Sequence, residues 1–158
     1  MTTPINTPPR VHALSILLPF GMAYFASHWF RGINAIISPD LVSEMHLNAA
    51  DLGLLSAAYF VSFAAFQLPL GILLDRFGPR RVNITLISLA GVGALLFSAG
   101  HDMITLTLAR ALIGLGVSAG LMAPVKATLM WFPSERVAAM NGWTFVLGFI
   151  GAIAATAP

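Results

Sequence analysis

The sequence predicts an all-α membrane protein, and three observations lead to this fold class. First, 58% of the 158 residues are hydrophobic and only 9% are charged, whereas a soluble domain carries about 25% charged residues. Second, the apolar residues gather in long runs that can cross a bilayer, which needs roughly 20 residues in a helix. Third, the basic residues between these runs fall on one side of the predicted path, as expected for membrane loops.

Composition also limits the class of function. The net charge is only +2 and no basic run is interleaved with aromatic residues, so we expect no nucleic-acid partner. The chain has no cysteine, and its four histidines show no spacing typical of metal ligands, so we expect no disulfide, metal or cofactor. The sequence has no nucleophile elbow, no phosphate-binding loop and no paired carboxylates within an apolar run, which argues against an enzyme.

The first element is a short tail over residues 1–12. It holds three prolines and no apolar run, and we expect it to be disordered. A signal peptide is the alternative, because Arg10 precedes an apolar core. However, the apolar run extends to Phe30, which is long for such a core, and no typical cleavage site follows it.

The first membrane span is predicted over residues 13–37. Pro19 lies inside it, where a membrane helix tolerates proline better than a soluble helix does. The Pro39-Asp40 pair is expected to end this span, and residues 38–51 then form a polar loop. The loop carries acidic residues but no Lys or Arg, so the charge rule places it outside the cell.

Two further spans are predicted over residues 52–74 and 82–99, joined by a tight turn rich in arginine. Such a turn cannot lie in hydrocarbon, where its backbone and its charges would have no partners. Residues 100–102 form a second outside turn, again without Lys or Arg.

A fourth span is predicted over residues 103–131 and a fifth over residues 137–158. In the fourth span Gly116 and Gly120 are four residues apart and share a helix face, which lets another backbone approach closely. The fifth span is still apolar at the last residue, so we expect the chain to be a fragment that stops within it. The alternative is a small five-helix protein that forms oligomers.

Basic residues near the ends of the apolar runs set the orientation. They fall on one side if the five spans alternate: Arg10, Arg76, Arg80, Arg81 and Arg136. No loop on the other side contains Lys or Arg. Because short loops rich in these residues stay in the cytoplasm, we expect a cytoplasmic amino terminus and a location in the plasma (inner) membrane.

Two motifs resemble those of a known family. The pattern Gly-x-x-x-Asp-Arg-x-Gly-x-Arg-Arg after the second span resembles the cytoplasmic loop between helices 2 and 3 of the major facilitator superfamily of secondary transporters. Its fixed positions are Gly71, Asp75, Arg76, Gly78, Arg80 and Arg81. The fourth span is similar to the fourth-helix motif of the same family, through Leu106, Arg110, Gly114, Gly116, Gly120 and Pro124.

The resemblance implies an amino-terminal half of such a transporter, with five of its twelve helices present. In similar transporters the arginine-rich loop holds the cytoplasmic face closed in one state and releases it in the other. Asp75 ends a span, where the partial negative charge of the helix terminus disfavours an acid. We therefore expect a specific partner for it: Arg76 or Arg81, or a helix amino terminus elsewhere.

Three polar residues within the spans are candidates for a substrate or proton path: Arg31, Asn34 and Arg110. Arg31 and Asn34 share a helix face, because they are three residues apart. Arg110 lies about 10 Å into its span, where a cation is costly unless it is paired or hydrated. The resemblance implies a role for it in proton coupling. Outer interfacial placement is the alternative for both arginines.

Two more polar side chains lie within or near the spans. Gln67 is expected to hydrogen-bond a neighbouring helix, and Lys126 to reach the inner interface.

The predicted function is alternating-access transport of a small solute. More specifically, the solute is expected to be an organic anion and its transport to be coupled to protons. The expected partners are the lipid bilayer, the solute and a missing carboxyl-terminal half. Two alternatives stay open. One is a sensor or assembly protein that kept the fold without transporting. The other is an integral membrane enzyme whose active groups lie outside this chain.

Overall fold

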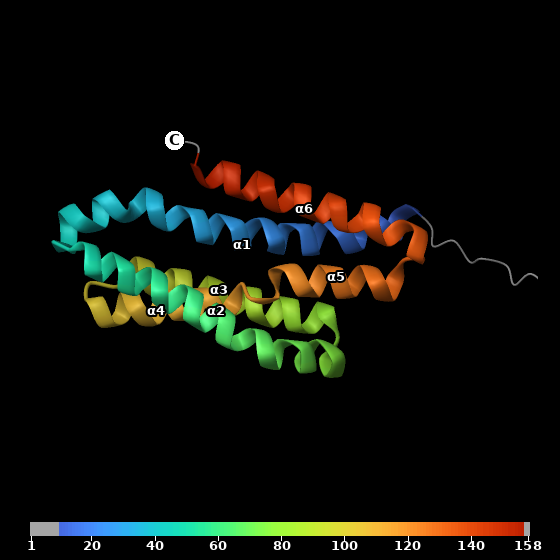
Figure 1. The fold of residues 1–158 in the computed structure, drawn as a ribbon, viewed down its shortest axis with the longest axis horizontal. Coiled ribbons are helices and arrows are strands. Elements are labelled where there is room, and N and C mark those ends of the chain that lie inside the picture. Colours follow the sequence, from blue (N-terminus) through green and yellow to red (C-terminus); the bar gives the residue numbers. More distant parts are fainter. Residues whose placement is uncertain (1–9, 157–158) are drawn as a thin grey trace, which may run out of the picture.

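The computed structural model describes residues 10–156, and within them it describes all side chains except those of residues 10–13 and 34. Nearly all of these residues are helical, and no strand occurs in the described part. The helices lie along one common direction (Figure 1), and successive predicted spans run in opposite directions. This confirms the predicted all-α class.

Helix α1 (Arg10–Met45) is longer than the predicted first span at both ends. It begins directly after Pro9, so the last three residues of the predicted tail are helical, while residues 1–9 lie outside the described part. It also continues through Pro39, although a proline inside a helix removes a backbone hydrogen bond and crowds the preceding turn. The predicted loop is therefore wrong over residues 38–45, and only residues 46–48 connect to the next helix.

Helix α2 (Ala49–Phe77) begins at a reciprocal cap. The side-chain oxygen Oδ1 of Asn48 accepts hydrogen bonds from the backbone N–H of Ala50 (2.8 Å) and of Asp51 (3.1 Å). The backbone N–H of Asn48 in turn donates to Asp51 Oδ2 at 2.9 Å. These bonds satisfy amides that the first helical turn leaves open, so the helix starts three residues before the predicted span.

Helices α2 and α3 (Pro79–Ala99) are joined by a single residue, Gly78. Its φ of 78° lies in the left-handed region that glycine adopts at low cost. The next residue, Pro79, takes the first helical position, which suits its missing N–H. The predicted arginine-rich turn therefore consists mostly of helix ends.

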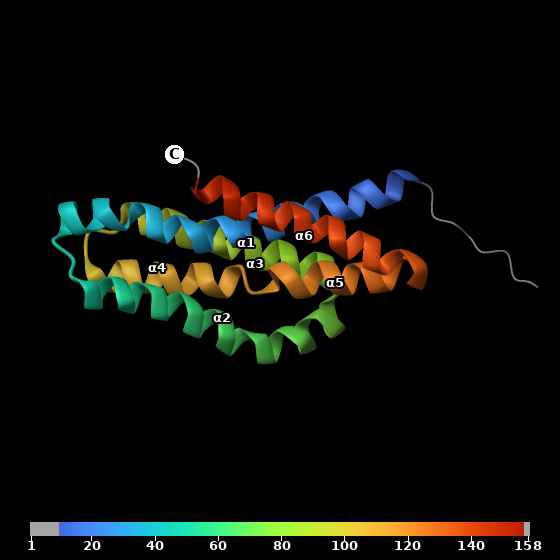
Figure 2. The same ribbon diagram turned by 45° about the horizontal axis from the view of Figure 1, so that its top comes forward.

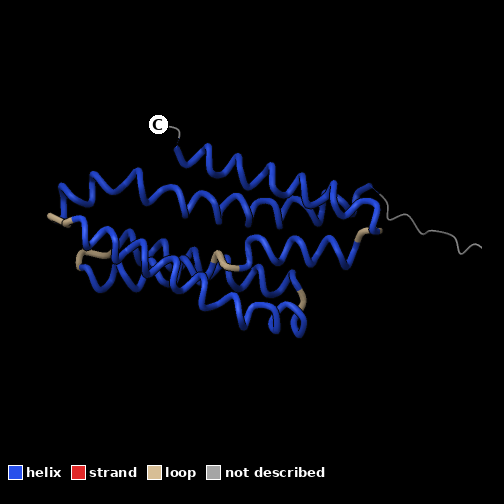
Figure 3. The backbone as a smooth tube through the Cα atoms, viewed as in Figure 1, coloured by secondary structure: helices blue, strands red, loops and turns tan. Residues whose placement is uncertain are grey.

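The fourth predicted span is two helices, α4 (Met103–Gly116) and α5 (Ala119–Trp131). The break at Val117 and Ser118 is visible as a short loop in the middle of the bundle (Figure 3). Ser27 Oγ donates to the Val117 carbonyl at 3.4 Å, and Gln67 Nε2 donates to the Ser118 carbonyl at 3.2 Å. The prediction that Gln67 bonds a neighbouring helix is confirmed, and the bonds stabilise the break.

The last helix, α6 (Ser134–Thr156), runs beside α1 along most of its length (Figure 2). Helices α4 and α5 lie at the centre: α4 packs between α2 and α3, and α5 contacts α1 and α3. The apolar core follows the same arrangement, with one cluster around Ala119, Ala123 and Ala127 and a second around Ile113 and Val117.

Three glycines of the fourth span allow these close contacts. A Cβ on Gly114 would collide with the carbonyl oxygen of Tyr59 on α2, and one on Gly116 would collide with the backbone of Ala90 on α3. A Cβ on Gly120 would lie 2.9 Å from Ser27 Cβ on α1. The predicted close approach of another backbone is found at Gly116, whereas at Gly120 the nearest atoms belong to the Ser27 side chain. The predicted shared face of Gly116 and Gly120 is wrong, because the helix breaks between them.

Four helical segments in the described part are long and apolar enough to cross a membrane: 49–77, 79–99, 103–131 and 134–156. Their outward faces carry exposed apolar side chains, such as Leu68 (85% exposed) and Ile104 (74%). In water such a surface would be costly, whereas in lipid it is the expected exterior. The described part is therefore a polytopic membrane bundle, and the first span over residues 13–37 stays a prediction.

Candidate functional site

Charged side chains gather in two regions of the bundle. We call the first the arginine cluster: Arg31, Tyr59 and Arg110, which come from α1, α2 and α4 and line one small cavity. We call the second the arginine turn: residues 71–81, at the junction of α2 and α3. The two regions lie in opposite halves of the molecule, because Arg110 follows the start of α4 and the arginine turn ends α2.

Arg110 is buried, with 2% of the residue exposed, although a guanidinium is always charged in proteins. Its central carbon lies 4.6 Å from the centre of the Phe97 ring on α3. A cation over an aromatic face is attracted by the ring, most strongly where water is excluded. Helix packing thus holds Arg110 inside the bundle, and the alternative placement at the outer interface is not what the structure shows.

Arg31 approaches the same place from α1. Its guanidinium carbon lies 5.5 Å from the centre of the Phe63 ring on α2, and the side chain as a whole is exposed. Arg31 and Arg110 line one cavity of about 40 Å³, together with Ser56 and Tyr59. The structure therefore brings together two of the three predicted path residues. The side chain of the third, Asn34, lies outside the described residues.

Tyr59 is the central residue of this cluster, with 3% of its surface exposed. It lines the same cavity as Arg31 and Arg110. From the sequence Tyr59 is only one of several aromatic residues within spans. Its backbone contact with Gly114 fixes its place against α4, and no pattern in the sequence pairs these two positions.

The electrostatics of the arginine cluster favour an anion. Two permanent positive charges line one small cavity, and no Asp or Glu is among the described residues that line it. Like charges repel strongly where water is scarce. A carboxylate, sulfonate or similar group would relieve that repulsion and accept hydrogen bonds from the planar guanidinium groups. At about 40 Å³ the cavity holds little more than one water molecule, so the cluster is closed in this conformation.

In the arginine turn, Asp75 forms an ion pair with Lys126 of α5. The expectation that its partner is Arg76 or Arg81 is wrong. Arg76 instead lies over the Phe77 ring, 5.4 Å from its centre, and Arg81 lines an apolar pocket beside Phe77. Lys126 reaches Asp75 because the end of α2 lies next to α5. Its predicted position at the inner membrane interface stays a prediction.

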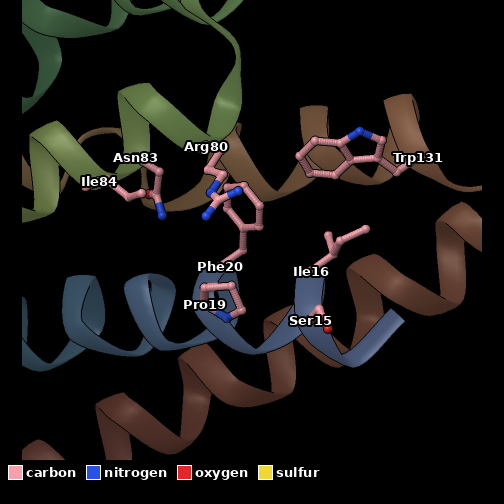
Figure 4. Close-up of a pocket in the computed structure, with 8 residues that line it drawn as sticks. All are labelled: Ser15, Ile16, Pro19, Phe20, Arg80, Asn83, Ile84 and Trp131. Atoms are coloured by element: carbon pink, nitrogen blue, oxygen red, sulfur yellow. The ribbon is translucent and has the colours of Figure 1, made fainter. Parts of the chain in front are cut away.

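The remaining residues of the turn motif have separate surroundings. A Cβ on Gly71 would meet no atom within 4 Å, so this glycine is not needed for packing in the described bundle. It lies on a cavity of about 500 Å³ between α2 and α5, which Asp75 and Lys126 also line. Arg80 points away from this cavity, into another one between α1, α3 and α5 (Figure 4).

The comparisons with known proteins decide the family. Residues 20–157 match the sequence model of the Major Facilitator Superfamily. The chain belongs to the major facilitator superfamily. The motifs around Asp75 and Arg110 lie inside the matched region. The matched family is the one that these motifs resemble.

Among its relatives, the chain is 37% identical over 103 residues to the uncharacterized transporter YybO of Bacillus subtilis, an overlap of 65% of this chain and 24% of the relative. It is 28% identical over 130 residues to the probable sulfoacetate transporter SauU of Cupriavidus necator (82% and 30%). It is also 28% identical over 102 residues to the nitrate/nitrite transporter NrtP of a Picosynechococcus strain (65% and 19%). The chain thus spans under a third of the length of these superfamily relatives.

Proposed function

We propose that the protein carrying this chain is a secondary active transporter that moves a small organic anion across the plasma (inner) membrane by alternating access. The observation that carries the proposal is that Arg31 and Arg110, which come from separate helices, line one cavity. The proposal includes a cytoplasmic amino terminus, which is supported by the basic residues at the arginine turn.

The chemistry of the pair supports an anion as the substrate. Guanidinium is planar and can bind two oxygens of one carboxylate or sulfonate at once. Two such groups on different helices can hold one anion between them, and Phe97 and Phe63 limit how each arginine can turn. Asn34, one turn from Arg31, stays a proposed third contact.

The names of two relatives agree with this substrate class. One is called a probable sulfoacetate transporter and another a nitrate/nitrite transporter. Both named solutes are anions. Neither identity is high enough to transfer a substrate, so these names support the charge of the solute and nothing finer.

Alternating access needs a second bundle against which this one can rock. We propose that the chain forms the amino-terminal part of that pair, with the partner bundle covering the face that carries the arginine cluster. The Asp75–Lys126 pair joins α2 to α5 at one end of the bundle. It would stabilise one state of the cytoplasmic gate and break or change partners in the other.

The proposal includes coupling of transport to protons. An arginine keeps its proton at physiological pH, so Arg110 would act as a fixed charge that shifts the protonation of another group. The motif resemblance supports this role. A test is uptake driven by an imposed pH gradient in proteoliposomes, and no response to the gradient in either direction would exclude coupling to protons.

Uptake measurements test the substrate class. The complete open reading frame that encodes this chain is reconstituted, and uptake of sulfoacetate, malonate and nitrate is compared with uptake of neutral alanine. We expect uptake of at least one anion, and a loss of about tenfold or more in Arg31→Gln and in Arg110→Gln. Arg136→Gln is the matched control, because Arg136 is an exposed residue at the start of α6. Equal anion uptake by all variants would contradict the proposal.

A further inference from the structure

Besides the cavity of the arginine cluster, the bundle holds a larger cavity near the arginine turn. It has a volume of about 610 Å³ and lies between the first part of α1, the first turn of α3 and the last turn of α5 (Figure 4). Neither the substrate path nor the Asp75–Lys126 pair includes it. Its position at the ends of three helices places it at the depth of lipid headgroups if the helices cross the bilayer.

The polar groups of this cavity are hydrogen-bond donors. Arg80 and Asn83 extend from α3 toward α1 in Figure 4, and the indole ring of Trp131 lines the cavity from α5. Asn83 is 7% exposed, so its amide points into the cavity from a buried position. No acidic side chain is among the described residues that line the cavity.

The local charge is positive for a second reason. Arg80 is the second residue of α3, and the N-cap residue Gly78 provides no side-chain hydrogen bond to the first turn. A helix amino terminus carries a partial positive charge, so a cation placed there is unfavourable unless an anion is near. A bound phosphate would accept hydrogen bonds from the guanidinium and offset the charge of the helix end.

The rest of the cavity is apolar. Ile16, Pro19, Phe20 and Ile84 form its other walls, and the Phe20 and Trp131 rings lie 6.2 Å apart. A cavity with donors in one part and apolar walls in another matches a molecule with a charged head and a hydrocarbon body. A soluble phosphate would use only the donors.

We propose that this cavity binds the headgroup phosphate of an anionic phospholipid from the leaflet that faces the arginine turn, with its glycerol and upper acyl chain against Ile16, Pro19 and Phe20. Basic pockets between membrane helices on the cytoplasmic side suit such headgroups. The site shares no residue with the arginine cluster or with the Asp75–Lys126 pair, although Arg80 belongs to the arginine turn.

Trp131 allows a direct test, because it lines the cavity. The complete open reading frame is prepared with Trp29→Phe and Trp143→Phe, and any tryptophan outside this chain is also replaced by phenylalanine. It is reconstituted with brominated phosphatidylglycerol or brominated phosphatidylcholine, because bromine quenches tryptophan fluorescence on contact. We expect brominated phosphatidylglycerol to quench Trp131 at a concentration about fivefold lower than brominated phosphatidylcholine does, because one arginine near a membrane surface provides a preference of about this size for an anionic lipid. Equal quenching by the two lipids would overturn the proposal.

Two arginine variants make the test specific to the cavity. Arg80→Gln should remove the preference for phosphatidylglycerol, whereas Arg81→Gln should keep it, because Arg81 lines a different pocket. An equal loss in both variants would mean a general charge effect and would overturn the site. If Arg80→Gln fails to fold, the comparison of the two lipids in the protein that keeps Arg80 still tests the proposal.

Soluble glycerol 3-phosphate is the last arm of the experiment. It offers the same phosphate without acyl chains, so we expect it to leave the quenching unchanged at millimolar concentration. Full protection of Trp131 by glycerol 3-phosphate would show that the cavity takes a soluble phosphate, and the assignment to a lipid would then be wrong.

Discussion

Arg110 of the arginine cluster and the arginines of the arginine turn place the same side chain in opposite surroundings. In the cluster Arg110 is 2% exposed and packs against an aromatic ring, whereas Arg76, Arg80 and Arg81 of the turn are all exposed. A charge at a bundle end costs little and can serve orientation alone. A charge inside the bundle is costly, so the buried arginine is the better indicator of a solute site.

The two regions also differ in how their charges are balanced. The turn contains an opposite-charge pair, Asp75 and Lys126. The described lining of the cluster contains two positive charges and no acid. In the turn, part of the positive charge is therefore neutralised by an acid of the same chain. In the cluster, the positive charges would be neutralised by an anion that binds from outside. This difference predicts that substitutions in the cluster change anion transport more than substitutions in the turn.

The largest effect is expected for Arg110→Lys. Lysine keeps the charge but loses the planar group that lies over Phe97 and can bind two oxygens of an anion. We expect anion uptake to fall by about tenfold or more, while Arg81→Lys, the same substitution in the turn, changes it less than about twofold. Initial uptake rates in proteoliposomes measure both. Similar losses in the two variants would remove the distinction between cluster and turn.

A second effect concerns the packing that supports the cluster. Gly114→Ala would force a methyl group against the Tyr59 carbonyl, and overpacking of this kind costs about 1–3 kcal/mol. Gly142→Ala is the matched control, because a Cβ there would meet no atom within 4 Å. Denaturant unfolding in detergent micelles compares the two. A Gly114→Ala protein as stable as Gly142→Ala would show that α4 can move away from α2 without cost.

A smaller effect on stability is expected in the turn. Asp75 is 74% exposed at its side chain, and exposed ion pairs stabilise proteins by only about 0–1 kcal/mol. Asp75→Asn should therefore change unfolding little and slow the transport cycle, with the apparent affinity for the anion unchanged. The double variant Asp75→Lys with Lys126→Asp should recover part of the rate if the pair itself matters. A lower affinity in Asp75→Asn would instead place the turn in the substrate site.

The smallest effect involves the helix that carries Arg110. Thr105 donates hydrogen bonds to Asp102 from its hydroxyl (2.6 Å) and its backbone N–H (2.9 Å), and these lower the pKa of the Asp102 carboxyl. The lowered pKa means that the stabilisation is present above the usual value near 3.9 and is lost as the pH falls through the lowered value. Asp102→Asn should reduce the acid sensitivity of unfolding below about pH 4. Identical pH profiles would exclude this contribution.

The order and type of the elements could be predicted from the sequence, because long apolar runs separated by charges have few other solutions in a membrane. Boundaries were predicted less well. Pro39 suggested a helix end, yet α1 continues to Met45, and only the cap at Asn48 fixes the start of α2. A proline weakens one turn of a helix, but the turns on either side can keep the helix continuous. The break between α4 and α5 was not predicted, because it depends on bonds from Ser27 and Gln67.

The sequence by itself determined the class of the protein, the positions of its polar residues and its family motifs, because composition and spacing are local properties. Tertiary structure alone decided which of these residues meet. Arg31 and Arg110 come to line one cavity although their helices are distant in the sequence, and Asp75 pairs with Lys126 because α2 ends next to α5. Contacts between distant segments depend on how whole helices pack against each other, and a single sequence does not contain that geometry in any local pattern.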